Sequence, residues 1–181
     1  MNIDKISIGK NPPEDINVII EIPGGSSPVK YEIDKESGAL FVDRFIMTSM
    51  VYPYHYGFVA HTLSKDGDPC DVLVIADMSV VAGCVIRARP IGVLLMEDES
   101  GFDEKILAVP VDEIHPCYSG IKSYKDLPQV VADRISHFFE QYKALEKNKW
   151  VKIQGWDGVE KAKQLIQESI DRAKEGKSRR V

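Results

Sequence analysis

The sequence predicts a mainly β protein of the α+β class, in which a small barrel or sandwich precedes two helices. The first two thirds of the chain contain many short β-rich segments with Gly and Pro turns between them, a pattern typical of small barrels and sandwiches. In the last third, apolar residues recur at three- and four-residue steps, as on the buried face of a helix. The chain has 181 residues and shows no linker or repeat, so we expect a single domain, residues 1–181.

The predicted strands begin with two segments of different pattern. Residues 17–22 are rich in β-branched residues and end at a loop of Pro, Gly and Ser. Residues 29–33 alternate between an apolar and a charged face, and the charged face carries Lys30 and Glu32. Further strands are predicted at residues 40–46, 57–61, 71–76, 84–96, 105–110 and 150–153.

Two amphipathic segments predict the helices. Pro128 suits the first turn of a helix, with Asp126 just ahead of it as the cap. The apolar stripe of this helix is Val131, Ile135, Phe138, Tyr142 and Leu145. The second helix starts after Asp157-Gly158, and its stripe is Val159, Ala162, Ile166, Ile170 and Ala173. The basic segment from Lys174 to Arg180 is interpreted as a solvated, frayed end rather than a binding site.

The composition argues against several classes of protein. A net charge of −5 at pH 7 disfavours binding to duplex nucleic acid, which requires a basic surface. The three cysteines, Cys70, Cys84 and Cys117, are widely spaced, which argues against a disulfide framework or a structural zinc site. The polar start is unlike a signal peptide, and no apolar run is long enough to cross a membrane. We therefore expect a cytoplasmic protein with reduced thiols and no membrane partner.

The sharpest local signal is the six-residue stretch Asp66-Gly67-Asp68-Pro69-Cys70-Asp71. Its three carboxylates repel one another, and a divalent metal ion such as Mg²⁺ would compensate them. The alternative for this motif alone is a solvated acidic turn. A calcium EF-hand loop starting at Asp66 is excluded, because Cys70, Asp71 and Asp77 stand where that loop needs a ligand, Gly and Glu.

Other acidic residues lie beside cations. Asp98 and Asp103 flank a loop, and Lys105 follows Asp103 at the two-residue step that places both on one strand face, as with Lys30 and Glu32. Any single pair is readily explained as a surface salt bridge. Because the arrangement repeats, it favours a site with several carboxylates, several metals and several cations, as a phosphate ester or anhydride requires.

A dense aromatic loop forms the third element of the candidate site. Residues 51–58 include three tyrosines, Tyr52, Tyr54 and Tyr56, close to Pro and Gly. Packing in the core is the alternative to a site wall that donates hydroxyls to phosphate oxygens. Tyr142 lies on the apolar stripe of its helix, which favours a core position. The histidines of this region, His55 and His61, are interpreted as structural.

Taken together, these segments closely resemble the bacterial-type soluble inorganic pyrophosphatases, nearly from end to end. The resemblance is carried by Glu21-Ile22-Pro23, Lys30-Tyr31-Glu32, Asp43-Arg44, Tyr52-Pro53-Tyr54-His55-Tyr56-Gly57, the acidic stretch from Asp66 to Asp71, Asp98 to Lys105, and Tyr142-Lys143. One departure is Cys70, where the family usually has an aliphatic residue; cysteine is a small hydrophobe, so little effect is expected.

The resemblance implies a five-stranded OB-like barrel flanked by the two C-terminal helices. It also implies hydrolysis of pyrophosphate to two phosphates by a metal-activated water that attacks in line. The cofactor would be Mg²⁺, several ions per site, with Mn²⁺ or Zn²⁺ as substitutes and Ca²⁺ as an inhibitor. An OB-type nucleic-acid-binding module without catalysis is the alternative, and the acidic charge argues against it.

The resemblance also assigns roles to individual residues. The metal ligands are Asp66, Asp71 and Asp103, helped by Asp98 and Glu32. Asp68 is chosen as the general base, and Asp98 is the second candidate, which the sequence does not separate from it. The groups that grip the phosphates are Lys30, Arg44, Tyr56, Lys105, Tyr142 and Lys143, and Tyr56 is also counted as catalytic. Glu21 and Tyr52 belong to the outer shell, where Tyr52 would orient a carboxylate or water.

A homohexamer is the implied assembly. His137 matches a position that the family uses in contacts between its trimers, and Gln141 stands where some members carry a second histidine. The two positions are one helical turn apart and share a face. Because Gln141 cannot acquire a charge, we expect this hexamer to loosen less on acidification than one with both histidines. The alternative is that His137 is an ordinary solvated residue of the helix.

Overall fold

The main sheet of the molecule closes on itself. The computed structural model describes residues 1–178, and within them five strands follow one another in the order β1-β4-β5-β8-β6, after which β6 pairs with β1 again. The strands are β1 (Ile16–Ile22), β2 (Val29–Ile33), β3 (Leu40–Phe45), β4 (His55–Val59), β5 (Cys70–Val74), β6 (Val85–Asp98), β7 (Gly101–Phe102), β8 (Lys105–Pro110) and β9 (Val151–Asp157). The helices are α1 (Gln129–Gln141) and α2 (Val159–Ser178), with short 3₁₀ turns η1 (Ile3–Lys5), η2 (Pro116–Tyr118) and η3 (Tyr124–Asp126).

Strand β1 completes the ring because both of its edges are paired. Val18 lies opposite Val59 of β4 on one side and Ile86 of β6 on the other. Only β5 and β8 run parallel, while the other pairs of the ring are antiparallel. Irregularities in β1 and β6 bend these strands, as closure of so few strands demands. The five-stranded closed architecture expected from the resemblance is confirmed.

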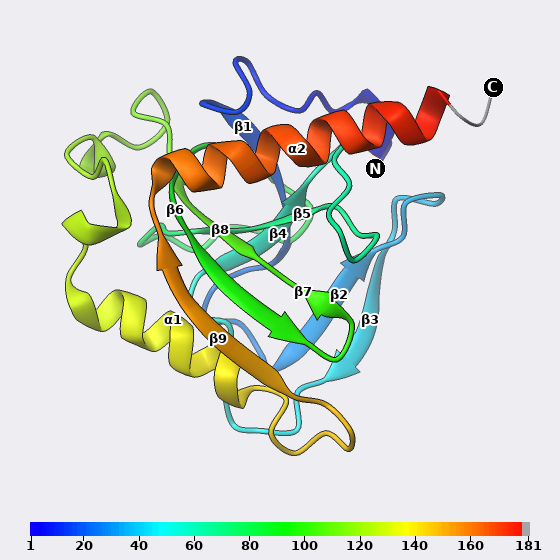
Figure 1. The fold of residues 1–181 in the computed structure, drawn as a ribbon, viewed down its shortest axis with the longest axis vertical. Coiled ribbons are helices and arrows are strands. Elements are labelled where there is room, and N and C mark those ends of the chain that lie inside the picture. Colours follow the sequence, from blue (N-terminus) through cyan, green and yellow to red (C-terminus); the bar gives the residue numbers. More distant parts are fainter. Residues whose placement is uncertain (179–181) are drawn as a thin grey trace.

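Both faces of the ring strands are buried, because each helix covers a different part of the sheet. Along β5, Val72 and Val74 pack in the cluster that contains Ile166 of α2, whereas Leu73 between them packs in the cluster that contains Phe138 of α1. In Figure 1, α2 crosses over the ring and α1 lies beside β9. This double burial explains why several strands are nearly continuous apolar runs in the sequence.

The first helix differs from its prediction at both ends. It ends at Gln141, with Tyr142 as the capping residue, so Leu145 lies beyond it and is 67% exposed. Asp126 does not cap α1, because its carboxylate accepts hydrogen bonds from the backbone N–H groups of Lys122 and Ser123 in a capping box of η3. Short polar side chains satisfy the nearest free backbone donors, which here belong to the preceding turn.

The second helix confirms its predicted core stripe. Ala162, Ile166 and Ile170 are buried against the ring, and α2 remains helical through Ser178 instead of fraying from Lys174. Arg179 and Arg180 of the predicted basic end lie outside the described residues. None of the helices in residues 1–178 has the length and apolar character that a membrane crossing requires.

Two predicted strands end at other residues in the structure, where tertiary contacts determine the boundary. The strand predicted at 57–61 is β4, which stops at Val59 and is followed by His61 in a left-handed conformation, with φ of 59°. The strand predicted at 150–153 extends to Asp157, because β9 continues to pair with β6 as far as Val93. Local patterns do not contain the position of a partner strand, so such boundaries are poorly determined by sequence.

Candidate active site

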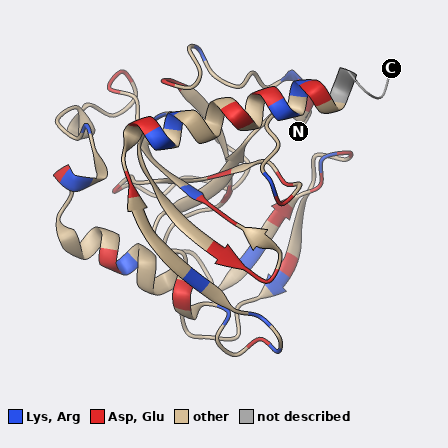
Figure 2. Ribbon diagram, in the orientation of Figure 1, with Lys and Arg blue, Asp and Glu red and all other residues tan. Residues whose placement is uncertain are grey.

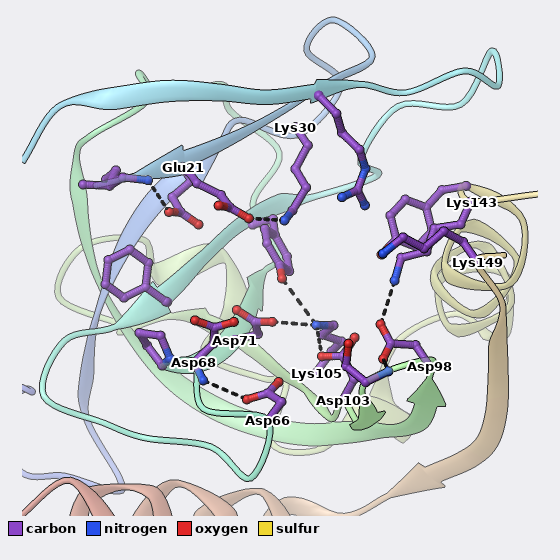
Figure 3. Close-up of a pocket in the computed structure, with 18 of the residues that line it drawn as sticks. Glu21, Lys30, Asp66, Asp68, Asp71, Asp98, Asp103, Lys105, Lys143 and Lys149 are labelled. Atoms are coloured by element: carbon purple, nitrogen blue, oxygen red, sulfur yellow. Dashed lines mark hydrogen bonds and ion pairs between the residues drawn. The ribbon is translucent and has the colours of Figure 1, made fainter. Parts of the chain in front are cut away.

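A cavity of about 320 Å³ opens between the ring, the β2–β3 hairpin and the end of α1. Its charged lining groups are eight carboxyls and six cations, among which are eleven of the charged residues predicted from the sequence: Lys143 and ten others. These ten are Glu21, Lys30, Glu32, Arg44, Asp66, Asp68, Asp71, Asp98, Asp103 and Lys105. Lys143, Tyr56 and Tyr142 also line it, so every predicted site residue except Tyr52 meets the same space. Figure 3 shows the labelled side chains pointing into the cavity, and Figure 2 shows acidic and basic positions side by side on β2, β3 and the β6–β8 turn.

Strand pairing explains how residues far apart in sequence meet here. The parallel register sets Val72 beside Ile106, so the preceding residues, Asp71 and Lys105, lie next to each other. In the hairpin, Lys30 lies directly opposite Arg44. The cavity is therefore built where strand ends from different parts of the chain converge.

The position of Tyr56 depends on the glycine that follows it. A Cβ on Gly57 would lie 1.9 Å from the carbonyl oxygen of Ile19, so only glycine allows β4 to approach β1 this closely. Tyr56 is itself buried, and burial, reinforced by the charge of Asp71, raises the pKa of its hydroxyl well above the ordinary value. Its hydroxyl is therefore a neutral hydrogen-bonding group.

Lys105 is the central cation of the site. Its Nζ donates hydrogen bonds to Asp71 Oδ2, at 2.6 Å, and to Asp103 Oδ1, and lies 3.4 Å from the hydroxyl oxygen of Tyr56. Burial alone would lower the pKa of Lys105, but the charges of Asp103 and Asp71 raise it well above its usual value. The lysine is therefore a fixed positive charge between two carboxylates (Figure 3).

A second ion pair closes the side of the cavity nearest to α1. The Nζ of Lys143 lies 2.7 Å from Asp98 Oδ2, and the other oxygen of this buried carboxylate accepts a hydrogen bond of 2.8 Å from the backbone N–H of Ser100. The Nζ of Lys149 lies 2.5 Å from Oε1 of Glu99. Although burial opposes it, the hydrogen bond from Lys149 and the nearby Lys143 lower the pKa of Glu99 to about 2.

The hairpin contributes a third charged group. Lys30 pairs with Glu32 and lies 3.4 Å from Asp43, whose carboxylate also accepts a hydrogen bond of 3.0 Å from Arg44. The Nε of Arg44 lies 3.2 Å from Glu146. Burial by itself lowers the pKa of Arg44, but Glu146 and the other negative groups raise it overall, so its guanidinium stays charged.

Glu21 differs from the other carboxyls because it is deeply buried on β1. Its Oε1 accepts a hydrogen bond of 2.7 Å from the backbone N–H of Ile33. Burial, with a further contribution from the charge of Asp71, raises the pKa of Glu21 to about 7, despite the hydrogen bond from Ile33. Near neutral pH this group is therefore only partly ionised, which sets it apart from the carboxylates paired with lysines.

The acidic loop, defined as residues 60–69 between β4 and β5, presents Asp66 and Asp68. Asp66 Oδ1 accepts a hydrogen bond of 3.0 Å from the backbone N–H of Asp68. Partial burial, together with repulsion from Asp103 and Asp71, raises the pKa of Asp66. The side chain of Asp68 is 76% exposed and has one ion-pair partner in residues 1–178, Lys35 at 3.5 Å. Asp68 is thus a readily accessible carboxylate of the cavity.

The donor set suits a hard divalent cation, although no ready-made metal cage is present. Within residues 1–178, no three His, Cys, Asp or Glu side chains converge on one point as metal ligands do. The ammonium group of Lys105 lies between Asp71 and Asp103 instead. The available ligands in the cavity are carboxylate oxygens without histidine or cysteine, which is the chemistry that Mg²⁺ prefers.

Tyr52 lies behind the site rather than in it. Its ring is 2% exposed and packs against Tyr56 and Phe138, with centroids 5.0 and 4.6 Å apart. Tyr52 therefore does not line the cavity itself, but its ring supports the lining residues Tyr56 and Tyr142 from behind. His55 also has a structural environment, since Gly24 N–H donates to its Nδ1 at 2.9 Å and its Nε2 lies 3.0 Å from the Met78 carbonyl oxygen.

Sequence reasoning missed four polar residues that line the cavity: Lys35, Glu99, Ser100 and Lys149. Glu99 and Ser100 lie within the Asp98–Lys105 segment, so that segment already pointed to them. Lys149 follows α1 in an irregular stretch that has no local signature. Its place in the site becomes evident only from its ion pair with Glu99.

Comparisons with known proteins agree with this geometry. The sequence profile of the family described as inorganic pyrophosphatase matches residues 18–174. A protein named inorganic pyrophosphatase from Bradyrhizobium diazoefficiens is 59% identical over 177 residues, which cover 98% of this chain and 99% of the relative. The crystal structure of an inorganic phosphatase from Anaplasma phagocytophilum superimposes with a TM-score of 0.92 at 50% identity, covering 94% of this chain and 99% of that one. The inorganic pyrophosphatase structure from Coxiella burnetii gives 0.89 at 53% identity, covering 92% and 99%.

These matches do not support the alternative of a nucleic-acid-binding module without catalysis. The profile covers all nine strands except the first residues of β1, and most of both helices, so the likeness is not confined to the acidic loop. By sequence and by structure, the chain belongs to the inorganic pyrophosphatase family.

Proposed function

We propose that this chain hydrolyses inorganic pyrophosphate to two phosphates in the carboxylate-lined cavity, with Mg²⁺ as its cofactor. The observation that carries the proposal is that thirteen of the fourteen predicted site residues line one cavity of this family's fold. Pyrophosphate hydrolysis needs an activated water, an in-line phosphorus and a stabilised leaving phosphate. The lining offers oxygen ligands for cations and cationic groups for phosphate oxygens in the same space.

The cationic groups and tyrosines would bind the phosphates. Arg44 can engage two phosphate oxygens at once, whereas Lys30, Lys105 and Lys143 act as point charges. Each of these cations is already held by a carboxylate, which orients it toward the cavity before substrate arrives. The neutral hydroxyls of Tyr56 and Tyr142 add hydrogen bonds. This is mainly electrostatic catalysis by preorganised groups.

The carboxylates of Asp66, Asp71 and Asp103 would hold the first divalent cation, and Asp98 and Glu32 would help to place others. Bound cations of this kind lower the pKa of water and offset the negative charge of the substrate. Mn²⁺ or Zn²⁺ would substitute for Mg²⁺. Glu21, which is buried and close enough to Asp71 to feel its charge, would influence the charge of these ligands from the outer shell.

Asp68 is the carboxylate best suited to accept the proton of the attacking water. Its side chain is exposed to the cavity and is contacted by Lys35 at 3.5 Å. Asp98, the other candidate, has one oxygen in an ion pair with Lys143 and the other in a hydrogen bond to Ser100 N–H. A carboxylate with both oxygens engaged is a poorer proton acceptor, so the local contacts favour Asp68.

A phosphate-release assay tests the proposed function. The purified chain is incubated with pyrophosphate and Mg²⁺, and inorganic phosphate is measured over time. We expect two phosphates for each pyrophosphate consumed. An absence of phosphate, combined with binding of single-stranded oligonucleotides, would instead support the nucleic-acid-binding alternative.

We expect Cys70 to be structural and Cys70→Val to retain most of the activity. The side chain is 4% exposed and packs with Val72 and Ile166. Burial, with a contribution from Asp71, raises the pKa of its thiol to about 12, so the reactive thiolate is not populated near neutral pH. Phosphate release and thermal unfolding of the variant are the measurements. A folded but inactive variant would reveal a role for the thiol.

Self-association to a homohexamer is part of the same proposal. The β2–β3 hairpin exposes large apolar side chains, Leu40, Phe41, Val42 and Phe45, which supports burial of this surface against another subunit. His137 and Gln141 are both exposed on α1, where a second copy can reach them. The three cysteines are free, which supports a cytoplasmic location.

The histidine argument predicts that Gln141→His makes the assembly more sensitive to acid. The new imidazole would stand one turn from His137, and two protonated rings repel each other. Sedimentation of both proteins at pH 7.5 and pH 5.5 is the measurement, and more dissociation of the variant at pH 5.5 is expected. A wild-type monomer at pH 7.5 would refute the hexamer, and equal acid sensitivity would refute the role of the histidine pair.

A further inference from the structure

The tip of the acidic loop has little packing of its own, apart from the Nζ of Lys65, which lies 5.3 Å from the ring centroid of Phe102. Lys65, Asp66, Gly67 and Asp68 are all exposed, and Gly67 at the tip adopts a left-handed φ of 97° with open space around it. Its carboxylates face those of Asp71 and Asp103 across the cavity, so charge repulsion tends to push the loop outward. Contacts at its base must therefore determine where the carboxylates are presented.

One such contact is the buried hydroxyl of Thr62. Its Oγ1 donates a hydrogen bond of 2.6 Å to the carbonyl oxygen of Val59 and accepts one of 2.9 Å from the backbone N–H of Cys70. Val59 ends β4 and Cys70 begins β5, and the two are paired in the sheet. Thr62 therefore joins both strands to the first turn of the acidic loop.

The other contact comes from α2, more than one hundred residues later in the chain. Leu63 N–H donates a hydrogen bond of 2.9 Å to the carbonyl oxygen of Ser169, and the Nη1 of Arg172 donates one to the carbonyl oxygen of Leu63. Both backbone polar groups of Leu63 are thus held by one turn of α2. Figure 1 shows α2 passing close to the segment that leads into the start of β5, where this loop lies.

From Leu63 the hydrogen bonds continue into the site. The next residue, Ser64, donates its backbone N–H to the carbonyl oxygen of Asp68 at 2.6 Å. The N–H of Asp68 in turn donates to Asp66 Oδ1 at 3.0 Å. A displacement of Leu63 would therefore move the two carboxylates that face the cavity, although Arg172 does not line that cavity.

We propose that Arg172 is a positioning residue for the acidic loop, and that it sets the affinity of the site for divalent cations through the placement of Asp66. The part concerning cations rests on the proposed function. Arg172 is suited to this role because its planar guanidinium forms a strong, directed hydrogen bond to a carbonyl oxygen. Groups that orient metal ligands typically change metal affinity by about 10–100-fold when they are removed.

The test compares Arg172→Ala with Lys174→Ala. Lys174 lies on the same helix, and its ammonium contacts Asp171 at 3.6 Å. Lys174→Ala therefore removes an equal charge from α2 without removing a hydrogen bond to the loop. Binding of Mg²⁺ and Mn²⁺ is measured by calorimetry without substrate, and hydrogen exchange is measured for the backbone amides of residues 62–68. Steady-state rates give the Mg²⁺ concentration for half-maximal activity and the KM for pyrophosphate.

For Arg172→Ala we expect cation affinity to fall by about 10-fold or more, with faster exchange at Leu63, Ser64 and Asp68. Activity should return at high Mg²⁺ concentration, which a general loss of structure would not allow. Lys174→Ala should resemble the wild type in every measurement. Arg172→Lys, which retains the charge but lacks the planar fork, should lie between the two and serves if the alanine variant does not fold.

Wild-type cation affinity and unchanged amide protection in folded Arg172→Ala or Arg172→Lys would overturn the proposal. Failure of the proposed function is recognised separately, by a wild-type protein that releases no phosphate. In that case the exchange rates of the loop amides still decide whether Arg172 positions the loop.

Discussion

Removal of divalent cations with excess EDTA is expected to abolish phosphate release, and added Mg²⁺ should restore it. The cavity contains eight carboxyl groups, and its five lysines and its arginine are already paired with carboxylates. A multiply charged pyrophosphate that enters without divalent cations would therefore meet a cavity with more carboxyl groups than cationic side chains. The measurement is the initial rate of phosphate release before chelation, after chelation and after readdition of Mg²⁺.

Ca²⁺ provides the matched control for this result. It has the same charge and also binds carboxylate oxygens, but its larger and more flexible coordination shell should position the reacting groups poorly. We expect Ca²⁺ to bind and to inhibit rather than restore activity. Full activity in excess EDTA would show that the carboxylates of the cavity have a purpose other than holding cations.

Replacement of Asp68 by Asn is expected to lower kcat by about 100-fold or more while metal binding is largely kept, because the amide retains the shape but not the proton acceptor. The side chain is exposed, with Lys35 as its ion-pair partner, so little loss of stability should follow. The measurements are kcat for pyrophosphate and Mg²⁺ affinity by calorimetry. They should be accompanied by thermal unfolding of the variant.

Two further substitutions test whether Asp68 or Asp98 is the general base. Asp71→Asn should mainly weaken metal binding and loosen Lys105, whose Nζ lies 2.6 Å from this carboxylate. Asp98→Asn removes the nearer of the two carboxylate partners of the buried Lys143 and should therefore cost stability as well as activity. If Asp68→Asn remains active while a folded Asp98→Asn is inactive, Asp98 is the base and our choice is wrong.

Local sequence patterns were sufficient for the elements and for most of the residues around the cavity. The alternation of residues 29–33 matches β2, and the apolar stripe of Ala162, Ile166 and Ile170 lies on the buried face of α2. These predictions succeeded because side-chain periodicity reflects burial of one face within a few residues. The roles of Asp66, Asp98 and the other charged residues came from the family resemblance, since no local rule pairs groups that lie thirty residues apart.

The sequence by itself determined where apolar and polar residues alternate as in strands, where apolar residues recur at helical spacing, and which acidic residues cluster. Each of these properties is local. Tertiary structure alone decided that β6 returns to β1, that the parallel register of β5 and β8 sets Asp71 beside Lys105, and that α1 ends before Leu145. It also decided that Arg172 of α2 binds the carbonyl of Leu63. The physical reason is that these features depend on which distant segment supplies the partner for a hydrogen bond or a buried face, and a residue's own neighbours in sequence carry no record of that partner.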